Sequence, residues 1–217
     1  MSEITSIGII GGTGEAGKSV GLLLSLAKFK VLLGSRDYTK ALNSANELTS
    51  LGAKDVFPVT NQDAAEADLV IFSTPWEGTL DLATLLKDSL KGKVVISMVN
   101  SLSVFNKNLI ALMPPKGSML LEVASVLTES FVYGAFNHLP SHAILKGEKI
   151  NSDVLIVGPD TKTKDIVMSV INKVDYLRAL YVGGYDYSWA VESFTAVLIK
   201  INKNYKIQSS IKIIGLD

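Results

Sequence analysis

Three glycines near the start of the chain have the spacing of a phosphate-binding turn. Gly12, Gly14 and Gly17 form the pattern G-x-G-x-x-G, directly after an apolar run and directly before a helical pattern. In this context the first glycine allows a sharp turn, the second lets the backbone approach a pyrophosphate, and the third lets the helix pack on the strand. Unpaired N–H groups and the helix dipole then attract the anion. We expect a dinucleotide here, the alternative being a glycine-rich turn that serves packing alone. The expected contacts are Gly12, Thr13, Gly14, Glu15, Ala16 and Gly17.

The residues after the second expected strand indicate which dinucleotide binds. That strand, over 30–34, is followed by Ser35, Arg36 and Asp37, with Lys40 one helical turn further on. An acidic residue at this place bonds the ribose 2′-hydroxyl of NAD, whereas an arginine can hold a 2′-phosphate through charge-assisted bonds. We expect NADP(H), with Ser35 and Lys40 adding a hydroxyl donor and positive charge. Two alternatives stay open: Asp37 reaches the ribose, or Ser35 caps a helix and Arg36 is a solvated charge.

Two further strand ends should border the same site. Thr74 and Pro75 follow one expected strand, and Val99 and Asn100 follow another. Ligands of open α/β sheets lie outside the carboxyl ends of the strands. We therefore expect the first pair beside the nicotinamide ribose and the second beside the ring. Glu77 could be a general acid, but no partner acid or base is evident near it, which favours a charge at a helix start.

Strand-like and helix-like segments alternate along the chain and must position these residues. Strands are expected over 4–10, 30–34, 56–59, 68–73, 93–98, 131–136, 153–157 and 176–182. Helices are expected over 15–28, 37–51, 78–90, 118–127, 161–172 and 188–205, and the proline-containing segment 101–116 is expected to loop. With right-handed crossovers, this alternation predicts an α/β fold with a doubly wound, mostly parallel Rossmann-type sheet, extended by a C-terminal α/β portion. We expect residues 1–135 to form the NADP-binding core and 136–217 to complete the second-substrate pocket, in one compact unit.

The composition argues against several other classes of protein. Lys plus Arg and Asp plus Glu both number 21 in the 217 residues, so no global positive field favours nucleic acid. Cysteine is absent, which excludes thiolate nucleophiles and disulfides. His138 and His142 are the only imidazoles, too few for a dedicated metal site. The N-terminus lacks a basic region followed by a long apolar run, and no apolar run is long enough to span a bilayer, so we expect no signal peptide and a cytoplasmic protein without a membrane partner.

Several sequence blocks together carry a family resemblance. They are residues 10–14 with Gly17, 34–37, 74–78, 117–118, 122–124, 135–137, 191–193 and 215–216. On these blocks the chain resembles the NADPH-dependent reductases of the deazaflavin coenzyme F420, the F420:NADP oxidoreductases. The blocks 117–118, 135–137 and those near the C-terminus are the more specific ones. The resemblance runs over most of the chain.

The resemblance implies direct hydride exchange between the nicotinamide and the deazaflavin ring of F420. It also implies a homodimer, with the F420 ring beside Ala135, Phe136 and Asn137 and partly closed by the C-terminal portion. Asn137 could bond the ring edge or could be a buried turn asparagine. No side chain is expected to act as acid, base or nucleophile, since hydride transfer between two bound rings requires mainly positioning.

Two segments leave the identity of the small-molecule redox partner open. The family usually carries a proline-containing segment where this chain has residues 97–102, and small or β-branched residues where it has 138–140. Both lie on the second-substrate side. One alternative is an NADPH-dependent reductase of another acceptor, such as a flavin, a ferric chelate, an imine or a carbonyl. Another is a non-catalytic NADPH-sensing module.

Overall fold

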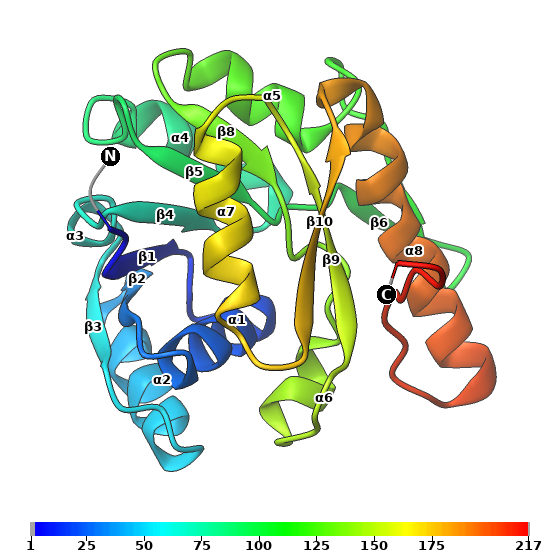
Figure 1. Ribbon diagram of the computed structural model, residues 1–217, viewed down its shortest axis with the longest axis horizontal. Helices are drawn as coiled ribbons and strands as arrows, with labels where there is room; N and C mark the ends of the chain where they lie inside the picture. The colour runs from blue at the N-terminus through cyan, green and yellow to red at the C-terminus, as the bar shows by residue number, and fades with distance from the viewer. Residues whose placement is uncertain (1–2, 217) are drawn as a thin grey trace.

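The computed structural model of the protein describes residues 3–216, whose strands and helices alternate along the chain (Figure 1). The strands of the large sheet are β1 (Ser6–Ile10), β2 (Lys30–Ser35), β3 (Val56–Thr60), β4 (Leu69–Phe72), β5 (Val94–Ser97), β8 (Phe131–Gly134), β9 (Ser152–Val157) and β10 (Leu177–Gly183). The helices are α1 (Glu15–Leu26), α2 (Tyr38–Ser50), α3 (Asn61–Ala64), α4 (Trp76–Leu86), α5 (Met119–Val126), α6 (Ser141–Leu145), α7 (Thr163–Asn172) and α8 (Ser188–Tyr205). A 3₁₀ turn, η1 (Tyr185–Tyr187), precedes α8.

The sheet has the strand order β10-β9-β8-β5-β4-β1-β2-β3. Six neighbouring pairs are parallel, and only the β8–β9 pair is antiparallel, through the single partnership of Gly134 with Val157. From β1 the chain passes first to β2 on one side and later to β4 on the other. This is the doubly wound arrangement that the sequence predicts, with β9 and β10 as its C-terminal extension.

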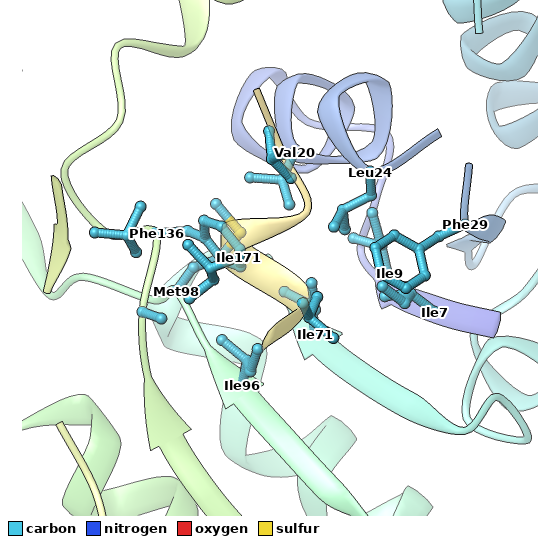
Figure 2. Close-up of a cluster of buried hydrophobic side chains, with 14 of the residues drawn as sticks. Ile7, Ile9, Val20, Leu24, Phe29, Ile71, Ile96, Met98, Phe136 and Ile171 are labelled. Atoms are coloured by element: carbon cyan, nitrogen blue, oxygen red, sulfur yellow. The ribbon is translucent and has the colours of Figure 1, made fainter. Parts of the chain in front are cut away.

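Each face of the sheet carries its own apolar core because alternate side chains of a strand point to opposite faces. Ile7 and Ile9 of β1 belong to one cluster, which packs against α1, α2, α6 and α7. Ile10 belongs to the other, which packs against α3, α4, α5 and α8. Figure 2 shows part of the first cluster, with Leu24 of α1 above Ile9 of β1. This two-sided burial holds the carboxyl ends of the parallel strands in fixed register.

The expected loop over 101–116 is wrong for its central part. Residues Leu102–Phe105 (β6) and Asn108–Ala111 (β7) form an antiparallel hairpin outside the main sheet. Asn106 and Lys107 connect the two strands, and both have positive φ, +47° and +61°. Such a turn matches the twist of a hairpin, although it usually contains glycine. The short helices α3 and α6 were also not expected.

The C-terminal helix α8 lies beside the β6–β7 hairpin at one side of the molecule (Figure 1). Apolar residues recur at helical spacing along α8, namely Ala190, Phe194, Val197, Leu198, Ile201 and Tyr205. Leu198 is buried, whereas Phe194, Val197 and Tyr205 are exposed. Over the part of the chain described, 3–216, no helix combines the length and apolarity that crossing a membrane requires.

Candidate active site

A cleft of about 760 Å³ opens at the carboxyl ends of β1, β2 and β4, where the strand order reverses. Ligands of doubly wound sheets bind at this place. Its walls come from the β1–α1 turn, the β2–α2 corner, the start of α3, the end of β4 and one side of α4. The lining residues are Gly11, Thr13, Gly14, Ser35, Arg36, Asp37, Lys40, Asn61, Ser73, Thr74, Pro75, Gly78, Asp81, Leu82 and Leu85.

The glycine turn has the expected shape, with one correction. Gly11, not Gly12, has the positive φ of the sharp turn, at +70°. Gly12 donates its N–H to the Gly34 carbonyl at 2.8 Å, and a Cβ there would lie 2.7 Å from Leu33 Cδ1. A Cβ on Gly17 would lie 2.7 Å from Gly12 Cα, so this glycine lets α1 pack on the turn as expected.

Gly14 is the position where the turn leaves room for a ligand. It is the N-cap of α1 and is exposed, and a Cβ built on it would meet nothing within 4 Å. The space is thus unfilled by protein at the positive end of the helix dipole, next to backbone N–H groups. These properties fit a pyrophosphate.

At the β2–α2 corner the acidic residue, Asp37, caps helix α2. Asp37 is the N-cap of α2, and its Oδ1 accepts the N–H of Lys40 at 3.2 Å. Ser35 Oγ accepts the N–H of Asp37 at 3.1 Å, so the serine braces the corner but is not the cap. Arg36 and Lys40 have exposed side chains and line the cleft. The corner therefore presents two cations to a ligand, which suits a 2′-phosphate.

The opposite wall is formed by α4. Thr74 and Pro75 line the cleft as expected, and Thr74 Oγ1 lies 2.7 Å from Thr79 Oγ1. Leu82 and Leu85, one and two turns along α4, add an apolar surface that sequence reasoning missed. The sequence carried a signal for this surface, because the two leucines are spaced i, i+3 on a helix that starts at an expected strand end.

One aromatic and one acidic side chain at the start of α4, Trp76 and Glu77, do not line the cleft. The indole N–H of Trp76 is buried without an acceptor among residues 3–216, and its ring packs on the second apolar cluster. Glu77 is exposed. No hydrogen bond links Glu77 to another side chain in that part of the chain, so the geometry assembles no acid–base pair around it.

A second group of expected residues meets beyond the cleft, at the ends of β5 and β8. Asn100 Nδ2 donates to the main-chain oxygen of Asn137 at 3.0 Å and lies 3.3 Å from Thr195 Oγ1. Asn137 Nδ2 donates to Asn100 Oδ1 at 3.1 Å and lies 3.4 Å from the Val99 oxygen. Thr195 of α8, which sequence reasoning missed, donates to the Asn137 oxygen at 3.1 Å. Three distant segments are thus joined by side-chain amides and one hydroxyl.

The side chains of Ala135, Phe136 and Val99 are buried in the cores, so at these positions only the backbone can face a ligand. Phe136 has φ of +65°, an uncommon conformation for a residue with a side chain. It redirects the chain after β8 and carries Asn137 to the network with Asn100.

The two histidines have separate structural partners. His138 is buried, and its Nε2–H donates to the Asp153 carbonyl at 2.8 Å. Burial lowers the pKa of His138, so the ring is neutral near pH 7. His142 Nδ1 lies 3.0 Å from Glu15 Oε1, which ties α6 to the start of α1. This exposed pair holds Glu15 at the start of α1, beside the glycine turn.

The arrangement is suited to binding and orienting a dinucleotide. The cleft brings together Thr13, Gly14, Ser35, Arg36, Lys40, Thr74 and Pro75 among the expected residues, and Gly12 and Gly17 shape it from below. Asn100 and Asn137 belong to the neighbouring network. Among residues 3–216, no three His, Asp or Glu side chains come together as metal ligands. The fold is of the Rossmann type, and this cleft has the place and shape of a dinucleotide site in that class of proteins.

Comparison with known proteins identifies the family. Residues 6–101 match the family described as NADP oxidoreductase, coenzyme F420-dependent. The chain is 38% identical to the F420-dependent NADP reductase of Methanocaldococcus jannaschii, over 97% of this chain and 99% of that protein. It is 27% identical to the enzyme of the same name from Methanothermobacter thermautotrophicus, over 95% and 93%. The chain belongs to the coenzyme F420-dependent NADP oxidoreductase family.

Solved structures agree on the fold. A candidate F420-dependent NADP reductase from Arthrobacter sp. FB24 superimposes with a TM-score of 0.82 at 18% identity, covering 97% of this chain and 99% of that one. A pyrroline-5-carboxylate reductase from Coxiella burnetii has a TM-score of 0.61 at 15% identity, covering 94% and 69%.

Proposed function

We propose that this protein transfers a hydride between NADP(H) and the deazaflavin coenzyme F420. The observation that carries the proposal is the pair of cations, Arg36 and Lys40, at one end of a cleft whose other parts fit the rest of a dinucleotide. Membership of the family supports the second substrate. When bound, the nicotinamide and the deazaflavin supply the redox chemistry, and both electrons move with the hydride.

We place NADP(H) along the cleft in three steps. The 2′-phosphate lies against Ser35, Arg36 and Lys40. The pyrophosphate lies over residues 12–17, where Gly14 leaves space. The nicotinamide ribose lies beside Thr74 and Pro75, which directs the ring toward Val99 and Asn100. On this placement residues 1–135 hold NADP(H), and residues 136–217 complete the pocket of the second substrate.

The network at Asn137 supports a second substrate with a ring N–H. The Val99 carbonyl and Asn100 Oδ1 both face Asn137 Nδ2, so the amide of Asn137 has its oxygen on the other side. That oxygen is buried without a donor among residues 3–216. A buried acceptor gains from a partner. The deazaflavin ring has an N–H that can supply one, and so has a flavin, whereas a ferric chelate or a simple carbonyl has none.

We also propose a cytoplasmic homodimer. Exposed apolar side chains gather on α8, on the β6–β7 hairpin and on the tail that follows α8, including Phe194, Val197, Val104, Phe105 and Ile214. Burying such a surface is the usual reason for association. Sedimentation equilibrium tests this: the proposal requires a dimer, and a Phe194→Glu/Val197→Glu double variant should sediment as a monomer.

The decisive assay mixes the purified protein with NADPH and oxidised F420 and follows loss of the visible absorbance of the deazaflavin. Parallel reactions contain a flavin, a ferric chelate, an imine or a carbonyl compound in place of F420. Turnover with F420 supports the proposal. Turnover only with another acceptor identifies a different reductase, and NADPH binding without any turnover identifies a sensing module.

Thr195 gives a residue-level test of the second-substrate side. Thr195→Val removes both hydrogen bonds of the hydroxyl while keeping its shape. We expect the KM for F420 to rise about fivefold, the effect of about 1 kcal/mol, with the KM for NADPH unchanged. Thr195→Ser should restore the KM for F420. Equal changes in both KM values would contradict this placement.

A further inference from the structure

One residue of the cleft wall holds the glycine turn from outside the β1–α1 unit. Asn61, the first residue of α3, accepts the N–H of Gly11 on its side-chain Oδ1 at 3.0 Å. Gly11 has the positive φ of the sharp turn. The same Oδ1 lies 2.9 Å from where a Cβ on Gly34 would be, directly before Ser35 and Arg36. Asn61 therefore touches both the pyrophosphate turn and the corner that carries the cations.

The position of Asn61 is fixed by close packing of α3 on the sheet. A Cβ on Gly8 of β1 would lie 1.8 Å from the Ala64 carbonyl, so α3 approaches the strand as closely as a glycine permits. The helix also begins with a capping box, in which Thr60 and Asp63 exchange side-chain and backbone hydrogen bonds. Asn61 is 7% exposed and has little freedom to move.

The hydrogen bond to Gly11 also fixes which way the amide faces. A backbone N–H can only donate, so the atom that faces it is Oδ1 and the NH₂ group points elsewhere. Nδ2 has no hydrogen-bond partner within residues 3–216, and it is not among the buried atoms without a partner there. Asn61 lines the cleft beside Ser35 and Arg36. Its two N–H donors are thus available to an acceptor in the cleft.

We propose that Asn61 is a positioning and specificity-determining residue for NADP(H). Its Oδ1 holds the turn, and its Nδ2 donates to an oxygen of the 2′-phosphate on the adenosine ribose. The inference depends on the NADP(H) site of the proposed function. It adds a neutral donor from a third segment, α3, to the two cations at the β2–α2 corner.

The substitution Asn61→Asp separates the two roles. The aspartate keeps an oxygen that can accept the Gly11 N–H, so the turn stays intact, but it replaces the donor by a negative charge. We expect the Kd for NADP⁺ to rise at least about tenfold, the effect of losing a hydrogen bond to a charged group, while the Kd for NAD⁺ changes less than about threefold. Calorimetric titration measures both. Asn46→Asp places the same charge on an exposed site of α2 and should change neither.

Comparing the binding of 2′,5′-ADP with that of ADP, which lacks the 2′-phosphate, localises the effect to the adenosine end of the nucleotide. Asn61→Ser removes the amide without adding charge, and it should weaken 2′,5′-ADP at least about threefold; this variant serves if the aspartate variant does not fold. An unchanged NADP⁺ to NAD⁺ preference in Asn61→Asp, or unchanged 2′,5′-ADP binding in Asn61→Ser, would overturn the inference. If the unaltered protein bound no NADP⁺, the proposed function itself would fail.

Discussion

Arg178 binds both carboxylate oxygens of Asp153, with 2.8 Å between Nε and Oδ1 and 2.9 Å between Nη2 and Oδ2. The two residues are direct neighbours on β10 and β9, and the Asp153 side chain is fully buried. The same carboxylate accepts the N–H of Ile213 at 2.5 Å, and Arg178 donates to the carbonyls of Ile213 and Leu216. One ion pair therefore anchors the C-terminal tail to the sheet.

Arg178→Ala should destabilise the protein and release the tail. The substitution removes the bidentate partner of a buried carboxylate and leaves, among residues 3–216, only the cation of Lys212, whose Nζ lies 3.4 Å from Asp153 Oδ1, so the free energy of unfolding should fall by about 2 kcal/mol. Urea unfolding measures this loss, and trypsin should cleave faster after Lys206 and Lys212. Lys164→Ala, which breaks an exposed pair with Asp160, should have little effect. Unchanged stability and cleavage in Arg178→Ala would contradict the anchoring role.

The ion pair also predicts how the protein responds to acid. Hydrogen bonding from Arg178 lowers the pKa of Asp153 from 3.8 to about 2, against the opposing effect of burial. The folded state therefore binds a proton less readily than the unfolded state, so the stabilisation is present above pH 4 and disappears as the pH falls toward 2. Between pH 5 and 2, the free energy of unfolding measured in urea should therefore fall more steeply for the native chain than for Arg178→Ala.

Glu192 should give the opposite pH dependence. Its carboxylate, on α8, accepts the N–H groups of Met119 and Leu120 at 2.9 and 2.8 Å, at the start of α5. Burial raises the pKa of Glu192 from 4.5 to about 7, although both hydrogen bonds act to lower it. Because the folded state retains a proton that the unfolded state releases, stability should fall by about 2–3 kcal/mol from pH 4.5 to 7 and then level off. Glu192→Gln should lack this slope in urea unfolding; an identical slope would exclude Glu192 as its source.

Arg36→Ala should change the nucleotide preference. Losing a charge-assisted hydrogen bond to the 2′-phosphate should weaken NADPH binding ten- to hundredfold, about 1.4–2.7 kcal/mol, with NADH binding nearly unchanged. Fluorescence titration with each nucleotide measures this. Lys54→Ala removes an exposed charge from the segment between α2 and β3, outside the cleft lining, and serves as the control. An equal loss for NADPH and NADH would reject the role of Arg36.

Gly14→Ala should leave the fold intact while weakening NADP(H). The added methyl meets no protein atom within 4 Å and φ of −72° is ordinary for alanine, but alanine is a poorer N-cap than glycine, so the free energy of unfolding should fall by less than about 1 kcal/mol. The methyl enters the space assigned to the pyrophosphate, so the Kd for NADP⁺ should rise at least about tenfold. Gly184→Ala, also unobstructed but outside the cleft lining, should bind NADP⁺ normally. Unchanged NADP⁺ binding by Gly14→Ala would contradict the assignment of the pyrophosphate to this turn.

The parallel half of the fold was predictable because its signals are local. Buried strands such as β4 read as continuous apolar runs, and α1 and α2 show helical periodicity between glycine or polar boundaries. The cations at the β2–α2 corner follow from the same reasoning, since the carboxyl end of a parallel strand is a known place for ligands.

The remaining features depend on tertiary contacts that a single sequence hides. The β6–β7 hairpin turns on Asn106 and Lys107, which lack the glycine that marks such turns, and the two prolines after it favoured a loop. The one-turn helix α3 had a capping box, Thr60 with Asp63, but too few residues for periodicity. Thr195 lies on a helix far along the chain, and only packing brings it to Asn137.

The reversal of strand direction between β8 and β9 divides the molecule into two parts that can vary separately. The cleft is built from parallel strand ends and close glycine contacts, and a Cβ on Gly8 or Gly17 would collide with backbone atoms of Ala64 or Gly12. The neighbouring network joins Asn100, after β5, and Asn137, after β8, to Thr195 of α8, which follows the antiparallel extension. We therefore expect a change of electron acceptor in this scaffold to require only a few polar substitutions in that network, whereas the cleft proposed for NADP(H) should tolerate few changes at its glycines.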